Sequence, residues 1–96
     1  MYLFTIEAVP SPKREESKNF DGAYVWCWIS YTEEWGAERL ARMYIEASGW
    51  IPGETTETSS LERSDCIKQE EQECFVEAES VGYCLVFHTW ASEEPV

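Results

Sequence analysis

The chain has 96 residues, of which 44% are hydrophobic and 15% aromatic, and its formal net charge at pH 7 is −12. This length predicts a single domain, residues 1–96, built around one modest core. The negative charge excludes the basic surface through which proteins bind nucleic acid nonspecifically, and it disfavours anionic membranes. A basic protein partner, or simply solubility, fits the charge better.

The sequence also carries signals about location. The start, MYLFTIEAVP, lacks the basic and long apolar regions of a signal peptide. No apolar run approaches the roughly 20 residues of a membrane span. We therefore expect a cytoplasmic protein whose four cysteines are reduced thiols.

The first third of the chain predicts two strands joined by a loop. Residues 2–9 alternate between apolar and polar side chains, as in a strand with one buried face. Residues 10–22 hold two prolines, six charges and an Asp-Gly pair, and predict a mobile loop. Residues 23–30, AYVWCWIS, are apolar on both sides, as expected of a central strand. On a strand these side chains divide into two sets: Tyr24, Trp26 and Trp28 on one face, and Ala23, Val25, Cys27 and Ile29 on the other.

A helix is predicted next. Ser30 and Glu33 have the spacing of a capping box, and apolar residues recur at helical spacing from there to about Ser48. Gly49 follows, where a helix commonly ends in a left-handed backbone conformation. The helix should therefore end close to residue 48.

A polar strand and a second helix follow. Residues 53–59 are Thr-rich, charged and free of bulky apolar groups, which predicts an edge strand. The second helix is predicted to begin at Ser64 or Asp65 and to reach Val81, with Gly82 as its C-terminal stop. We expect its many carboxylates to cover a solvated outer face.

One alternative remains open near the end of the chain. Residues 74–79 also alternate, so they could form a hairpin with residues 83–90 instead of helix. Residues 83–90 predict a second strand that is apolar on both sides. Residues 91–96 are expected to be a frayed polar tail.

The resulting element order is β-β-α-β-α-β. It predicts an α+β fold, a two-layer sandwich in which two helices, most simply on one face, cover a four-stranded mixed sheet. In that arrangement the second apolar face of strands 23–30 and 83–90 needs a cover, which could be loop 10–22, a second copy of the chain, or a ligand or partner. Helices on opposite faces would leave only a core.

Motifs for chemistry are few. The gaps between Cys27, Cys66, Cys74 and Cys84 lack the short Cys-x-x-Cys hooks of zinc sites, so we predict no metal and expect the cysteines to pack as small apolar residues. His88 is the one histidine, and nothing supplies the third, orienting group of a catalytic set. There is no Gly-rich phosphate loop. The sequence thus predicts no catalytic residue and no cofactor, and an enzyme is disfavoured.

Two functions fit these observations. The preferred one is a noncatalytic protein-interaction module that acts as a homodimer or through a basic protein partner. The alternative is a small-molecule-binding or enzymatic domain with an aromatic pocket, which a cavity of a few hundred Å³ would support. The candidate binding residues in both cases are Tyr24, Trp26, Trp28 and His88. A depressed pKa at Cys27 would favour chemistry, whereas inert buried thiols would favour packing.

Overall fold

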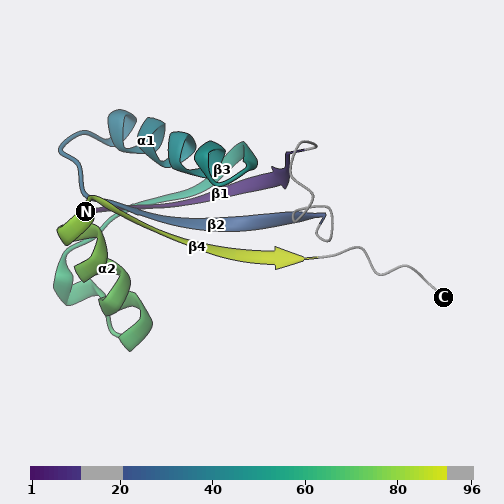
Figure 1. The fold of residues 1–96 in the computed structure, drawn as a ribbon. Helices are drawn as coiled ribbons and strands as arrows, with labels where there is room; N and C mark the ends of the chain where they lie inside the picture. Colours follow the sequence, from purple (N-terminus) through teal and green to yellow (C-terminus); the bar gives the residue numbers. More distant parts are fainter. Residues whose placement is uncertain (12–20, 91–96) are drawn as a thin grey trace.

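The computed structural model describes residues 1–11 and 21–90 of the chain (Figure 1). In chain order the elements are β1 (Tyr2–Pro10), β2 (Gly22–Ile29), α1 (Glu34–Ala47), β3 (Trp50–Ser60), a short 3₁₀ turn η2 (Arg63–Asp65), α2 (Gln69–Val81) and β4 (Tyr83–Trp90). The predicted α+β class and the β-β-α-β-α-β order are confirmed. The predicted tail, 91–96, and most of the predicted loop, 12–20, lie outside the described residues.

The four strands form one sheet in the order β3-β1-β2-β4. Every neighbouring pair is antiparallel, so the expectation of a mixed sheet was wrong. The physical reason lies in the crossover through α1. It carries the chain from β2 over β1 to β3. Strands β2 and β3 are therefore parallel but separated by β1, and they do not pair. Sequence patterns report which strands exist, but they do not report which strands are neighbours.

The two helices pack on opposite faces of the sheet, which corrects the two-layer sandwich with both helices on one face (Figure 1). Helix α1 lies along the face that carries Val25, Cys27 and Ile29 of β2, where Ala41 and Ile45 are fully buried. Helix α2 lies on the face that carries Trp28, where it buries Phe75 and Ala78. Because both sides of β2 are apolar, burial favours a cover on each side.

The two glycines predicted the C-terminal ends of the helices, whereas the predicted polar cap at the start of α1 is absent. Gly49 and Gly82 have φ values of 87° and 99°, the left-handed region in which glycine is favoured, and both helices end beside them as predicted. The predicted capping box at the start of α1 does not form. The helix begins at Glu34 without a side-chain cap, and the Ser30 amide instead donates a 3.0 Å hydrogen bond to the Gly82 carbonyl.

Residues 74–79 are helical, so the hairpin alternative is excluded. Helix α2 begins at Gln69, four residues after the predicted cap Asp65. Asp65 belongs to η2, where its carboxylate accepts a hydrogen bond from the Glu62 amide at 2.8 Å. Phe75 and Ala78 are the buried residues of this helix, whereas Val81 at its end is 61% exposed.

The polar strand β3 lies at one edge of the sheet, as predicted, although it is longer than residues 53–59. Pro10 and Gly22, which the sequence assigned to the loop, belong to β1 and β2. Neither α1 nor α2, the helices of the described residues, has the length and apolar character needed to cross a membrane.

Candidate functional site

The side of the sheet that carries Tyr24, Trp26 and Trp28, which we call the Trp face, is built from three rows of side chains. Residues directly opposite each other on neighbouring strands share a face, so the register defines each row. The rows, counted from the α2 end, are Leu3, Trp28 and Cys84; then Glu57, Thr5, Trp26 and Val86; then Glu7, Tyr24 and His88. Backbone pairing alone thus aligns side chains from all four strands on this face.

Helix α2 covers only the first of these rows. Trp28 is 1% exposed beneath the helix, whereas Trp26 is 40% and Tyr24 is 43% exposed. Figure 1 shows why: α2 lies at one end of the sheet, and no described element covers the rest of this face. We call the uncovered part, which carries Tyr24, Trp26, His88 and Trp90, the open face.

The rings of the open face contact one another in pairs. The Trp26 and His88 ring centroids are 4.5 Å apart at an interplanar angle of 56°, and those of Tyr24 and Trp90 are 5.0 Å apart at 42°. Trp90 can lie flat because the glycine opposite it, Gly22, has no side chain where the indole sits. Three of the four candidates, Tyr24, Trp26 and His88, are therefore brought together as an aromatic surface.

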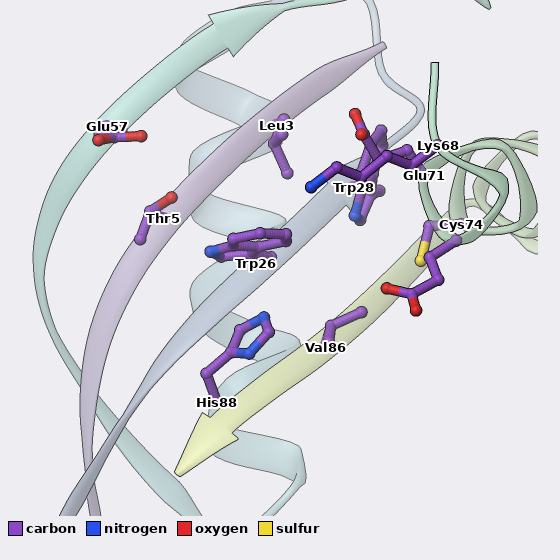
Figure 2. Close-up of a pocket in the computed structure, with 11 residues that line it drawn as sticks. Leu3, Thr5, Trp26, Trp28, Glu57, Lys68, Glu71, Cys74, Val86 and His88 are labelled. Atoms are coloured by element: carbon purple, nitrogen blue, oxygen red, sulfur yellow. The ribbon is translucent and has the colours of Figure 1, made fainter. Parts of the chain in front are cut away.

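A cavity of about 360 Å³ lies where the open face meets the first turn of α2 (Figure 2). We call it the Trp26 pocket. Its apolar wall is formed by Leu3, Trp26, Trp28 and Val86. The fourth candidate, Trp28, thus contributes to the site from beneath the helix. A small-molecule site, the alternative predicted from the sequence, would need a cavity of a few hundred Å³, and this cavity has that size.

Charged side chains surround the apolar wall of the Trp26 pocket. Glu57 comes from β3, Lys68 immediately precedes α2, and Glu70 and Glu71 belong to the first turn of that helix. A second, shallower hollow of about 480 Å³ adjoins it and shares Trp26, Glu57 and His88. The two hollows make one groove with an aromatic floor and a mostly acidic rim.

Among the described residues, the buried indole nitrogen of Trp28 has no hydrogen-bond partner, and the ring that carries it is part of the pocket wall. In Figure 2 this nitrogen lies on the side of the Trp28 ring nearest Trp26 and Val86. A buried donor left unpaired costs about 1–3 kcal/mol, so this position strongly favours an acceptor.

Cys27 cannot cooperate with His88, because the two side chains lie on opposite faces. Cys27 is fully buried against α1, and His88 is exposed beside Trp26 on the Trp face. Burial raises the pKa of the Cys27 thiol to about 12, and it outweighs the Arg42 charge, which acts in the opposite direction. The thiol is therefore protonated and packed at neutral pH, the outcome that favours packing over chemistry.

The other thiols gather between α2 and β4. Cys66 and Cys84 are buried in the same cluster as Trp28, and Cys74 packs against that cluster. Burial, followed by hydrogen bonds with Glu77 and Cys74, raises the pKa of the Cys84 thiol. All four cysteines are free. Within residues 1–11 and 21–90 no group of three potential ligands is placed to hold a metal ion.

The sequence did not identify the charged rim. Glu70 and Glu71 were expected on a solvated outer face, but both line the pocket from the first turn of α2. Glu57 lies in the polar strand that was predicted only to form an edge of the sheet and to block unwanted strand pairing. No sequence motif connects these residues, because they come together only in the folded structure, where α2 meets the sheet.

Comparison with protein-family models, curated proteins and solved structures found no significant match to this chain. The arguments about function below therefore rest on the residues of the site itself.

Proposed function

We propose that this chain is a noncatalytic interaction domain that binds a basic protein partner across the open face. The observation that carries the proposal is the partial cover of the Trp face, which leaves Tyr24 and Trp26 more than a third exposed beside His88. Protein interfaces concentrate Tyr and Trp at a central patch inside a polar rim. The open face has this composition.

Charge supports a basic partner. The chain carries a net charge of −12, and the groove itself is lined by Glu7, Glu57, Glu70 and Glu71 against one lysine, Lys68. Complementary charge steers partners together and suppresses wrong ones. A lysine or arginine side chain of the partner would also gain a cation–π interaction on the face of an exposed indole such as Trp26.

The same charges argue against a homodimer. A second copy would bring another −12 to the contact, and face-to-face packing would set acidic rims against each other. We therefore expect a monomer in sedimentation at low salt. A tight dimer at low salt would contradict the basic-partner proposal and would indicate that a second copy of the chain covers the open face.

Catalysis has less support. His88 lies against the Trp26 ring, whereas Cys27 faces the other side of the sheet, so the two side chains cannot act as a nucleophile and base pair. The one observation that favours a second candidate, a small-molecule site, is the Trp26 pocket of about 360 Å³.

The proposal is tested with a basic probe, an acetylated and amidated decapeptide of alternating lysine and alanine. Binding is titrated by NMR at two salt concentrations. Trp26→Ala should weaken binding by about fivefold or more, as truncation of a central interface aromatic does. Glu57→Gln should weaken it less, and high salt should weaken it further.

Two control variants remove the same groups from the opposite side of the molecule. Trp35 and Glu46 are exposed on α1, so Trp35→Ala and Glu46→Gln match the site variants in size and charge. Both should bind the peptide as the unchanged protein does. If Glu46→Gln weakens binding as much as Glu57→Gln, the attraction is nonspecific and the proposal fails.

A further inference from the structure

The indole nitrogen of Trp28, which has no partner in the part of the chain that the structure describes, determines which groups the Trp26 pocket can accept. Trp28 is 1% exposed, and its indole N–H is a donor with no acceptor capacity. Lys68, which also lines the pocket, is likewise a donor only. The buried Trp28 N–H therefore calls for a hydrogen-bond acceptor in the occupant, and the exposed Lys68 ammonium can donate to the same kind of group.

The rest of the pocket restricts the kind of acceptor. The carboxylates of Glu57, Glu70 and Glu71 repel an anionic acceptor such as a carboxylate. The flat walls of Trp26 and Trp28 favour an aromatic ring, which stacks on or packs edge-on against an indole. The occupant that satisfies the pocket is therefore an uncharged aromatic group that carries an acceptor.

Interface energetics narrow the choice further. The side chains that dominate binding at protein interfaces are Trp, Tyr and Arg. Tryptophan and arginine have donors only, so either would leave the Trp28 N–H unpaired. Tyrosine alone combines an aromatic ring with an oxygen that accepts a hydrogen bond.

We propose that the Trp26 pocket binds a tyrosine side chain of the basic partner. The phenol ring packs against Trp26 and Val86, and its hydroxyl oxygen accepts a hydrogen bond from Trp28 Nε1. The hydroxyl proton is then free to be donated to a carboxylate of the rim, such as Glu71. This inference rests on the proposed function, because it names the anchor of the same partner.

Two peptides of equal charge distinguish binding of the tyrosine side chain in the Trp26 pocket from the general attraction of a basic peptide to the acidic groove. They are the acetylated and amidated sequences Lys-Lys-Tyr-Lys-Lys and Lys-Lys-Phe-Lys-Lys. The tyrosine peptide should bind about fivefold more tightly, the worth of one net hydrogen bond. In ¹⁵N-labelled protein only the tyrosine peptide should move the Trp28 indole N–H resonance downfield, as a new acceptor does.

A matched pair of variants tests the assigned nitrogen. Trp28→Phe keeps an aromatic ring but removes the N–H, so the preference for tyrosine over phenylalanine should fall to about one. Trp35→Phe, on the exposed side of α1, should keep the full preference. If Trp28→Phe does not fold, the indole resonance of the unchanged protein still decides the question.

The outcomes distinguish the two proposals. If both peptides bind equally, the basic-partner function stands and the tyrosine anchor is overturned. If neither peptide binds, the partner function fails and the anchor fails with it. A final titration uses p-cresol and toluene: if p-cresol moves the Trp28 resonance while the peptides do not bind, the pocket takes a small phenol and not a partner's tyrosine.

Discussion

Replacing Phe75 by alanine should release α2 from the sheet and leave the rest of the fold in place. Phe75 and Ala78 are the buried residues of this helix, so Phe75 supplies most of its apolar attachment. Its ring also lies 6.0 Å from the Arg63 guanidinium, a contact that the substitution removes. Truncating a buried phenylalanine costs about 3–5 kcal/mol. The α1 side of the sheet has a separate cluster that does not include Phe75.

Hydrogen exchange followed residue by residue measures this effect. Since about 1.4 kcal/mol is a factor of ten, the loss corresponds to roughly 10²- to 4 × 10³-fold lower protection of α2 amides. Amides of α1 should change little, and Trp28 fluorescence should shift to longer wavelength as water reaches the indole.

The control is Val76→Ala on the same helix, where the side chain is 51% exposed and alanine is the better helix former. That variant should keep full protection. Equal loss of protection in α1 and α2 of Phe75→Ala would refute the reasoning, because it would show one cooperative core and not two.

Three further predictions follow from the thiols and the helix end. Cys27 should not react with a disulfide reagent in the folded protein. The Cys27→Ala variant and the unchanged chain should therefore be labelled at the same rate when folded. In denaturant, the unchanged chain should show one more reactive thiol than the variant. Above pH 9 the Cys27 thiol ionises in the unfolded chain but stays protonated in the fold until about pH 12, so the free energy of unfolding should fall by about 1.4 kcal/mol per pH unit in that window. Urea titrations at pH 8 and pH 10.5 should show a smaller fall in Cys27→Ala; an equal fall would contradict the assignment. Gly82→Ala should lower stability by about 1 kcal/mol, because φ is 99° there, and Gly82→Asn should cost less; equal urea midpoints for all three chains would exclude strain at this residue.

The strands were predictable because their signal is local. Alternation with a period of two identified β1, and runs of apolar residues identified β2 and β4, each to within one residue at its ends. Strand β2 lies inside the sheet, as its two apolar sides predicted, whereas β4 lies at an edge although it is also apolar on both sides. The position of the helices was not predictable. Both sides of β2 are apolar, so the pattern that normally shows which face is buried gives no answer there.

The candidate site was predicted in part for the same reason. Tyr24 and Trp26 share a face by simple alternation, and His88 joins them because β4 pairs with β2 in the register that sets Tyr24 opposite His88. The rim of the Trp26 pocket depends on where α2 starts and on which end of the sheet it covers. Those are outcomes of packing between Phe75 and Trp28, and no spacing in the chain encodes them.

The register of the Trp face also gives it a direction. Its polar side chains, Thr5, Glu7 and Glu57, come from β1 and β3, whereas its aromatic ones come from β2 and β4. The surface is therefore amphipathic across the strands and not along them. A molecule laid on it meets carboxylates on one flank and rings on the other. Rotated by half a turn, the same molecule would move its cations away from Glu7 and Glu57 and set its apolar groups against these carboxylates, so the sheet itself selects one orientation.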